Sequence, residues 1–325
     1  MILNRQQTID KINEFTSKRD PFLFVIDFDA TSGVVLSPEE AAEANILFNI
    51  RGKSNYKKRV LKPLPFTFDP LPVSPSVYKK AFNRVLDHLN RGDTYLINLT
   101  FQTEIKTNLN LKNLFHRSEA PFRLLFDDQF VVFSPESFVE IKGNKIYSFP
   151  MKGTIDASIP KARHKILDDK KELYEHTTIV DLIRNDLSMV SSGVEVKRFR
   201  YIDLIRTNRN NLLQVSSEIC GTLESGFRKN LGEVIFKLLP AGSVTGAPKE
   251  KTVRIIRESE NYRRGFYTGI FGYWDGYSLQ SGVMIRFIEN ENGKLFFKSG
   301  GGITAKSDAG FEYNELIQKI YVPVL

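Results

Sequence analysis

The stretch PFRLLFDDQFVVFSPESFVEIKGNKIYSFP, residues 121–150, contains four segments that predict β-strands. Apolar runs separated by turn residues place these strands at 122–126, 130–133, 138–141 and 145–149. Long β segments of this kind are interleaved with several helices along the chain. This organisation indicates an α+β protein with large antiparallel sheets, and the regular βαβ alternation of a doubly wound fold is absent.

Further strands and helices are predicted on both sides of this stretch. Apolar runs predict strands at 22–28, 95–101, 194–199, 213–219, 267–273, 279–288 and 294–299. The clearest helix is 166–189, where Leu173, Val180, Ile183 and Leu187 form one stripe. Other helices are predicted from Val77 to Gly92, at 230–239, from Pro248, which suits a first helical turn, and at 309–320.

The N-terminal part of the chain has a different character. A polar and basic segment follows the strand at 22–28 and runs to about residue 62. Prolines between Pro63 and Pro75 then predict an extended connector. We therefore expect residues 1–72 to form a short N-terminal segment packed into the same unit, and residues 73–325 to form the larger domain.

Composition excludes several classes of protein. The 325 residues are 41% hydrophobic, which is enough for a large core. Charged residues in the first twenty positions exclude a secretory signal, and no apolar run reaches the ~20 residues that span a bilayer. The single cysteine, Cys220, excludes an internal disulfide framework and fits a reducing cytosol. We expect a soluble, cytoplasmic protein with no membrane partner.

The net charge of +8 is compatible with nucleic acid, an anionic membrane or a small acidic substrate as the partner. Positive residues are mostly interspersed with acidic ones, and the densest cluster, from Arg51 to Lys62, is typical of a solvated loop. No zinc-finger, RRM or helix-turn-helix pattern is present. A nucleic-acid-binding protein is therefore a remote alternative, which steeply salt-dependent binding would reveal.

Two pairs of glutamates are candidate metal ligands. Glu172 and Glu175 are spaced i, i+3 on a predicted helix, and so are Glu312 and Glu315, so each pair shares a helix face. The first pair shares its face with apolar residues, which indicates that this end of the helix points inward. Taken alone, each pair is more often a solvated helix face. Four carboxylates that converge would suit Mg²⁺, which prefers oxygen ligands.

Three other features are candidates for binding or reacting with an anion. The segment SGGGITA (299–305) has three glycines between a predicted strand and a predicted helix. These glycines allow positive φ, and the exposed N–H groups could bind an anion. The alternative is that the segment forms only a tight turn. Arg286 lies in a predicted apolar strand, where it needs either a structural salt bridge or a substrate carboxylate. Lys152 is either an exposed turn residue or a nucleophile or base with a lowered pKa.

These features occur together in the order found in one family. The matching segments are GDTYLINL (92–99), SPESF (134–138), PMKGT (150–154), EHTTIVDLIRND (175–186), SVTGAPK (243–249), GIFGY (269–273), MIRF (284–287), GGGI (300–303) and EYNE (312–315) with Lys319. Over about residues 75–322 the sequence resembles the chorismate-utilising enzymes, which include component I of aminodeoxychorismate and anthranilate synthases and the isochorismate and salicylate synthases. The resemblance implies two large antiparallel sheets packed as a sandwich with helices outside, and a chorismate-binding catalytic domain at 73–325.

The resemblance also implies a role for each candidate residue. Glu175 and Glu315 are similar to the family's Mg²⁺ ligands, with Glu172 and Glu312 ligating directly or through water, and the metal holds the ring carboxylate of chorismate. The residues that resemble a cradle for the substrate carboxylates are Arg286, Tyr273, Lys319 and the amides around Gly301 and Gly302. The residues that resemble the lining of the substrate ring are Gly153, Thr154 and Thr245.

Lys152 discriminates between branches of the family. Aminodeoxychorismate synthases typically carry lysine at this position, whereas anthranilate synthases carry alanine. The similarity implies that Lys152 attacks C2 of chorismate while the C4 hydroxyl leaves, and that ammonia then adds at C4 and expels the lysine, on the route to para-aminobenzoate and folate. Glu136 resembles the acid that protonates the leaving hydroxyl and later acts as base, which requires burial to raise its pKa.

Two residues depart from this pattern. His176 is more usual in anthranilate synthases, so an enzyme that releases anthranilate and pyruvate, with His176 as a catalytic residue, stays open as an alternative. Leu96 replaces the usual Gln of ammonia-using members and the catalytic Lys of water-using members, and an apolar side chain argues against isochorismate synthase. No match to the tryptophan-feedback motif of anthranilate synthases is found, which favours the folate branch.

The source of ammonia is expected to lie outside this chain. A glutaminase needs a nucleophilic cysteine, and Cys220 lies in the strand-like segment EICGT without a matching nucleophile elbow. Ammonia then comes from solution or from a separate glutamine amidotransferase subunit, and we expect such a subunit as a partner.

Overall fold

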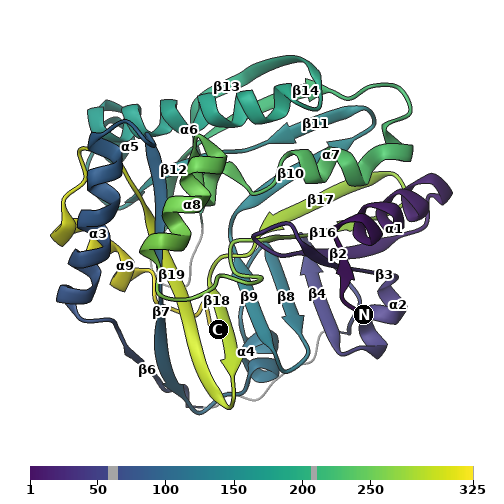
Figure 1. The fold of residues 1–325 in the computed structure, drawn as a ribbon, viewed down its shortest axis with the longest axis horizontal. Coiled ribbons are helices and arrows are strands. Elements are labelled where there is room, and N and C mark those ends of the chain that lie inside the picture. Colours follow the sequence, from purple (N-terminus) through teal and green to yellow (C-terminus); the bar gives the residue numbers. More distant parts are fainter. Residues whose placement is uncertain (58–64, 206–210, 325) are drawn as a thin grey trace.

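The computed structural model describes residues 1–57, 65–205 and 211–324, and these fold into two antiparallel sheets with helices on their outer faces (Figure 1). Each pair of neighbouring strands in this part of the chain is antiparallel. The α+β class and the two-sheet sandwich expected from the sequence are therefore confirmed. None of the described helices is long and apolar enough to cross a lipid bilayer.

Sheet A joins strands from the N-terminal, central and C-terminal parts of the chain. Its order is β1 (Leu3–Asn4), β3 (Ser32–Leu36), β2 (Phe22–Ile26), β16 (Ile270–Trp274), β17 (Ser278–Val283), β10 (Ser137–Lys142), β11 (Lys145–Ser148), β14 (Leu212–Thr222) and β12 (Met151–Asp156), and β13 (Ser192–Ile205) also pairs with β14.

Sheet B also combines distant segments. Its order is β15 (Gly246–Ala247), β7 (Leu96–Thr107), β19 (Lys294–Ile303), β18 (Phe287–Glu291), β9 (Phe130–Ser134), β8 (Phe122–Phe126), β4 (Ile46–Ile50) and β5 (Lys53–Ser54), and β6 (Phe68–Leu71) pairs with β7. Residues 1–72 thus contribute strands to both sheets.

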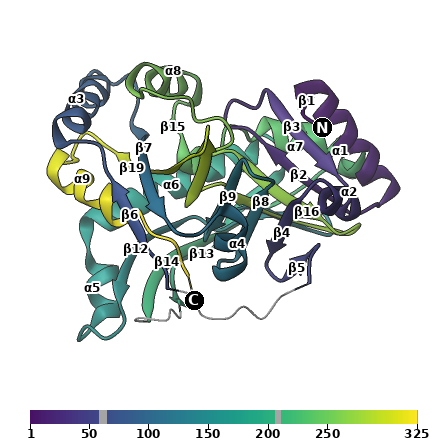
Figure 2. The ribbon, with the colours of Figure 1, turned by 90° about the horizontal axis from the view of Figure 1, so that it is seen from below.

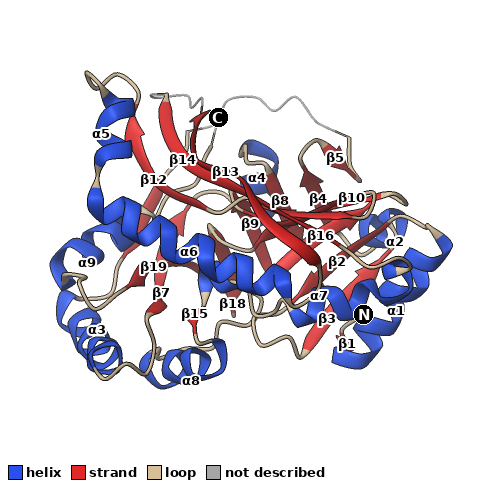
Figure 3. Ribbon diagram, turned by 90° about the horizontal axis from the view of Figure 1, so that it is seen from above, coloured by secondary structure: helices blue, strands red, loops and turns tan. Residues whose placement is uncertain are grey.

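Helices cover the outer face of each sheet. On sheet A lie α1 (Arg5–Lys18), α6 (Lys170–Ser188) and α7 (Leu231–Lys237), and Figure 3 shows α6 crossing this sheet. On sheet B lie α3 (Pro75–Asn90), α4 (Leu111–Arg117), α8 (Lys249–Ser259) and α9 (Ala309–Gln318), and α3, α8 and α9 gather at one end of the molecule in Figure 2. The short segments that remain are α2 (Pro38–Glu43), α5 (Ala162–Asp168), η1 (Phe227–Asn230) and η2 (Gly242–Val244).

Strand alternation explains why the apolar runs are continuous. In β8, Phe122, Leu124 and Phe126 face the core between the two sheets, while Leu125 faces the helices outside sheet B. In β2, Leu23 and Val25 face the core between the sheets, whereas the alternate residues of the strand, Phe22, Phe24 and Ile26, face α1 and α7. Successive side chains point to opposite faces of a sheet, and here both faces are covered, so every position must be apolar.

Several boundaries differ from the sequence prediction. The polar segment expected from about residue 29 to 62 contains β3, α2, β4 and β5, because short apolar runs such as 34–36 and 46–48 are enough to form buried strands; residues 58–62 of it lie outside the described residues. The helix predicted at 166–189 is divided into α5 and α6 at Asp169, whose side chain accepts a hydrogen bond from the Glu172 amide at 3.0 Å and caps α6.

The predictions around the catalytic motifs need three corrections. The strand predicted at 279–288 is interrupted, because Arg286 adopts a left-handed φ of 53° between β17 and β18. The glycines at 300–302 belong to β19, not to a turn, and none of them has a positive φ. A Cβ at Gly300 would lie 2.3 Å from the Leu99 carbonyl, so glycine is required for close strand approach. Pro248 is the N-cap residue of α8, one position before the first turn.

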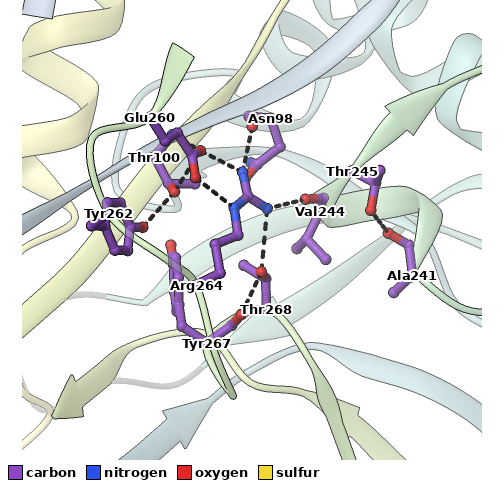
Figure 4. A network of polar contacts seen from close by, with 10 residues as sticks. All are labelled: Asn98, Thr100, Ala241, Val244, Thr245, Glu260, Tyr262, Arg264, Tyr267 and Thr268. Carbon is purple, nitrogen blue, oxygen red and sulfur yellow. Dashed lines mark hydrogen bonds and ion pairs between the residues drawn. The ribbon is translucent and has the colours of Figure 1, made fainter. Parts of the chain in front are cut away.

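A buried ion pair connects the ends of several of these elements (Figure 4). Arg264 and Glu260 are 4% and 8% exposed. The Arg264 Nε atom donates to Glu260 Oε2 at 2.9 Å, and Nη2 donates to Oε1 at 2.6 Å. The same Oε1 accepts from the backbone N–H and the hydroxyl of Thr100 in β7. Because each charge has close hydrogen-bonding partners, the pair tolerates burial.

The guanidinium also fixes three backbone segments. Its Nη1 atom donates to the Val244 carbonyl in η2 at 2.8 Å and to the Thr268 hydroxyl, which precedes β16, at 3.2 Å. Its Nη2 atom donates to the Asn98 carbonyl in β7 at 2.7 Å. One side chain therefore sets the relative positions of η2, β7 and the start of β16.

We expect replacement of Arg264 by Met to be strongly destabilising. Glu260 would lose its cationic partner within a buried site, and breaking such a pair typically costs about 3–5 kcal/mol. The matched control is Arg257→Met, because Arg257 is 63% exposed and pairs with Asp29 at 2.6 Å on the surface. Such a pair contributes about 1 kcal/mol or less. Urea unfolding of the two variants measures both values, and equal losses would contradict the role given to Arg264.

Candidate active site

A cavity of about 250 Å³ lies among the ends of strands from both sheets, next to α6. Sheet A contributes residues of β10, β12 and β14, and sheet B contributes residues of β7 and β19. The charged residues that line it are Glu136, Lys152, Glu175, Asp186, Arg286, Lys298 and Lys319. Charged side chains from segments this far apart in the sequence make the cavity the candidate active site.

Most of the residues expected at the site meet at this cavity. Those that line it are Glu136, Lys152, Glu175, Arg286, Gly301, Gly302 and Lys319. Glu172, Gly153, Glu312 and Glu315 lie directly behind this lining, in contact with the same strand ends. The two acidic helix faces, on α6 and α9, therefore point to a common region of the molecule.

The first glutamate pair surrounds Lys152. The Lys152 Nζ atom lies 2.7 Å from Glu175 Oε2. Burial alone would lower the pKa of Lys152, but the carboxylates of Glu175, Glu315 and Glu172 outweigh it, so the pKa is raised. Gly153 has a φ of 80°, and a Cβ there would lie 2.8 Å from Glu172 Oε2. The left-handed backbone favours glycine at 153, and a larger side chain would also displace the Glu172 carboxylate.

The second glutamate pair approaches the glycine strand. A Cβ at Gly301 would lie 3.6 Å from Glu312 Oε2 and 3.8 Å from Glu315 Oε1. The Lys319 Nζ atom, at the end of α9, lies 2.7 Å from Glu315 Oε1 and donates to the Gly300 carbonyl at 3.0 Å. Burial lowers the pKa of Lys319 in spite of its pairing with Glu315.

The four carboxylates have the donor chemistry of a magnesium site. Glu172 Oε2 is buried without a hydrogen-bond partner in the described structure, and burial raises the pKa of both Glu172 and Glu312. Carboxylates held together at this cost are suited to a divalent cation. The lysines compete for the same oxygens, however, and no three acidic, His or Cys side chains of the described residues are close enough together to hold a metal ion as they stand.

Arg286 faces the cavity as an unpaired cation. Its guanidinium lies 5.0 Å above the Tyr321 ring, and its Nε atom is buried without a hydrogen-bond partner in the part of the chain that the structure describes. Among the ion pairs of those residues, none involves Arg286. Of the two alternatives, a structural salt bridge or a fork for an anion, the geometry supports the second.

Glu136 also lines the cavity, directly before β10. Its Oε1 atom accepts a hydrogen bond from the Ser243 hydroxyl in η2. Burial raises the pKa of Glu136, and Ser243, Lys319 and Arg286 oppose that increase only in part. A raised pKa is the direction that a general acid requires near neutral pH.

Besides Gly153, three of the expected substrate-binding residues do not line the cavity. Tyr273 in β16 packs against Phe48, with ring centroids 5.1 Å apart, at the core between the sheets. Thr154 is exposed on β12. Thr245 is fully buried, but its hydroxyl donates to the Ala241 carbonyl at 2.8 Å.

Other polar residues take their place. The cavity is lined by Asn98, Ser243, Tyr267 and Thr268, none of which was expected from the sequence as a site residue. Tyr267 and Tyr273 lie in the same tyrosine- and glycine-containing segment. Tyr267 belongs to the turn before β16, whereas Tyr273 belongs to the strand itself. Thr268 is a β-branched residue with a φ of 60°, which is strained and is held by Arg264.

His176 lies behind the cavity wall. It is fully buried on α6, and its Nε2 atom lies 2.7 Å from the Ser217 hydroxyl on β14. Burial, together with Arg200 and Lys152, lowers its pKa to about 4, so the imidazole is neutral at pH 7. His176 therefore supports the helix that carries Glu175 and does not line the cavity itself. Leu96 does line it, beside Gly302.

Comparison with known proteins identifies the family to which this chain belongs. The family model described as chorismate binding enzyme matches residues 36–324. An uncharacterized PabA-like protein of Pasteurella multocida is 50% identical over 97% of this chain and 98% of its own length. Aminodeoxychorismate synthase component 1 of Bacillus subtilis is 29% identical over 81% of this chain and 58% of its own length.

The fold of this chain is also similar to that of a solved structure. Anthranilate synthase component I from Streptococcus pneumoniae superposes with a TM-score of 0.67 at 26% identity, over 79% of this chain and 59% of that one. The family match covers sheet B, the part of sheet A that follows β3, and each of the segments that line the cavity. The chain therefore belongs to the family of chorismate binding enzymes.

Proposed function

We propose that this protein is component I of an aminodeoxychorismate synthase, which converts chorismate and ammonia to 4-amino-4-deoxychorismate in para-aminobenzoate and folate biosynthesis. The observation that carries the proposal is Lys152, a lysine within the cavity at 2.7 Å from Glu175 and on the same cavity as Glu136 and Arg286. The similarity to the Bacillus subtilis aminodeoxychorismate synthase component 1 supports the same activity.

Chorismate is a dianion, and the cavity offers cations for it. Arg286 has no carboxylate partner among the described residues and is free to take a substrate carboxylate. Lys319 reaches the same cavity beside the backbone of Gly301 and Gly302. Mg²⁺ bound by Glu172, Glu175, Glu312 and Glu315 would supply further positive charge for a substrate carboxylate.

In the proposed reaction Lys152 is the nucleophile. Its neutral amine forms a bond to C2, the two ring double bonds shift, and the C4–O bond breaks. Ammonia then bonds to C4, the double bonds shift back, and the C2–N bond to Lys152 breaks. The raised pKa of Lys152 means that the amine is protonated while it pairs with Glu175, so it becomes nucleophilic only when that ion pair is released.

Glu136 supplies and recovers the proton. Its carboxyl gives a proton to the leaving C4 oxygen, which departs as water, and the carboxylate later takes a proton from the nitrogen that ammonia has added to C4. Burial of Glu136 favours the protonated form that the first step needs.

The ammonia is proposed to come from a separate glutamine amidotransferase subunit. The only cysteine of the chain, Cys220, is buried in β14 and is paired across the sheet with Tyr147. A buried cysteine lacks the exposure that a glutaminase nucleophile requires. Ammonium salts should replace the partner in the assays below.

The second candidate is anthranilate synthase component I, which forms anthranilate and pyruvate. The similarity to the Streptococcus pneumoniae enzyme favours it, and so does His176. In this structure the lowered pKa of His176 makes it neutral at pH 7, and it is buried and is not among the residues that line the cavity, which argues for a supporting role. Identifying the products of the reaction with chorismate distinguishes the two candidate functions.

We expect Lys152→Ala to abolish product formation. Purified protein is incubated with chorismate, Mg²⁺ and ammonium, and the product is identified by mass. Loss of the nucleophile should lower the rate by at least about 10³-fold. Lys171→Ala is the control, because Lys171 is a neighbouring lysine that is 60% exposed and only 3.7 Å from Glu175. A fully active Lys152→Ala variant would remove the proposed mechanism.

The same incubation separates the two candidate functions. We expect 4-amino-4-deoxychorismate without pyruvate, because the enolpyruvyl group stays on the ring when only the C4 hydroxyl is exchanged. Pyruvate is measured with a coupled lactate dehydrogenase assay. Stoichiometric pyruvate and anthranilate in the absence of any added lyase would identify the second candidate instead.

We expect the activity and the binding of chorismate to depend on Mg²⁺. Removal of divalent ions with EDTA should abolish product formation, and Mg²⁺ should restore it. Isothermal titration calorimetry gives a second readout, in which Glu175→Gln should weaken Mg²⁺-dependent chorismate binding by at least about tenfold. The control is Glu195→Gln, an exposed glutamate on β13 that pairs with Lys197. Unchanged binding in Glu175→Gln would exclude this carboxylate as a ligand.

A further inference from the structure

The contact between Ser243 and Glu136 joins two segments that are 107 residues apart in the sequence. The Ser243 hydroxyl donates to Oε1 of Glu136, and both residues line the cavity. Among the described residues no other hydrogen bond to the Glu136 carboxyl exists, so Oε2 has no hydrogen-bonding partner there. The two oxygens of this carboxyl are therefore not equivalent.

The position of Ser243 is fixed on both sides. Before it, Gly242 packs so closely on α6 that a Cβ would lie 2.8 Å from Asp186 Oδ2, and Asp186 is held by Lys249 at 2.9 Å. After it, the Val244 carbonyl accepts from the buried Arg264 at 2.8 Å. Two largely buried ion pairs thus hold the short helix η2, which carries the hydroxyl.

The backbone of Glu136 is fixed as well. Its carbonyl accepts from the Val283 amide in β17 at 3.1 Å, and its own amide donates to the Ser134 hydroxyl at 3.1 Å. The freedom that remains is rotation of the Glu136 side chain. A single hydroxyl held at a fixed place is enough to select one orientation of that side chain.

The charges around Glu136 do not replace Ser243. Arg286, from the β17–β18 connection, and Lys319, from the end of α9, act on Glu136 as positive charges, and the buried Tyr267 lies near it. Lys152 and Glu175 line the same cavity. None of these side chains donates a hydrogen bond to the carboxyl in the described structure, so they affect its charge more than its orientation.

We propose that Ser243 is a positioning residue that holds Oε1 of Glu136 and thereby presents Oε2 as the oxygen that exchanges the proton with the C4 substituent. This inference rests on the proposed function. Oε1 accepts from Ser243 in both protonation states, as carbonyl oxygen of the acid and as carboxylate oxygen of the base. The proton on Oε2 leaves with the C4 oxygen as water when the C4–O bond breaks, and Oε2 later takes one proton from the amine added at C4.

The hydrogen bond has a second consequence, for the pH dependence. A donor stabilises the ionised carboxylate more than the neutral acid, so it lowers the pKa that burial has raised. Its removal should therefore raise the pKa of Glu136. A rate that requires protonated Glu136 falls as pH rises through that pKa, and this alkaline limb should move to higher pH when the donor is lost.

The test compares Ser243→Ala with wild type and with Ser243→Thr, which keeps a hydroxyl. We expect kcat of Ser243→Ala to fall by about tenfold with KM nearly unchanged, and its alkaline limb to move up by about one pH unit. Ser243→Thr should recover most of the rate and the original limb. A wild-type kcat and pH profile in Ser243→Ala would overturn the proposal, and so would a rate loss without any shift of the limb.

A double-mutant comparison separates positioning from general support of the fold. In a Glu136→Gln background the carboxyl is absent, so adding Ser243→Ala should change the remaining rate by less than about twofold. The same tenfold loss in both backgrounds would show that Ser243 acts on something other than Glu136. Should Ser243→Ala fold poorly, the near-isosteric pair Ser243→Thr and Ser243→Val makes the same comparison.

Infrared difference spectroscopy keeps this inference distinguishable from the proposed function. The carboxyl stretch of Glu136, assigned by its loss in Glu136→Gln, is titrated in protein without substrate. We expect its midpoint to rise by about one pH unit in Ser243→Ala. An unchanged midpoint contradicts the inference whatever the enzyme makes, while a shifted midpoint in a protein that produces anthranilate contradicts the proposed function alone.

Discussion

The ion pair between Arg264 and Glu260 is the interaction on which the geometry of the cavity depends. Buried charges are tolerated only where their hydrogen-bonding groups have partners. Here the guanidinium donates to carbonyls of η2 and β7 and to the Thr268 hydroxyl. These same segments carry cavity-lining residues. The fold thus places a structural charge pair directly behind the wall of the reaction site.

Charge balance in the cavity follows from this arrangement. Two glutamate pairs from α6 and α9 approach one region, and Lys152 and Lys319 offset part of their repulsion. A divalent cation would compete with these lysines for the same oxygens. The proposed chemistry uses that competition, because a lysine that loses its carboxylate partner is closer to the neutral nucleophile that the reaction needs.

The sequence predicted the sheets well and the catalytic turns less well. Continuous apolar runs, such as 122–126, identify strands whose two faces are both buried, and helix-spaced glutamates identified two carboxylate pairs that do approach each other. Arg286 was assigned to a strand because its neighbours are apolar, and its left-handed φ has no local signal. Tyr273 was expected because the segment GIFGY resembles the family, whereas Tyr267, which lines the cavity, precedes β16 and belongs to no matching segment. The hydrogen bond between Ser243 and Glu136 could not be predicted from residue spacing, because the two residues are 107 positions apart in the sequence.

The covalent intermediate on Lys152 is the central claim of this account. Its most direct test is intact-protein mass spectrometry of the enzyme mixed with chorismate and Mg²⁺ without ammonia, followed by peptide mapping. We predict an adduct with the mass of chorismate less one water, located on Lys152 and lost when ammonium is added. Turnover to the aminated product with no adduct on Lys152 under any quench time would contradict it.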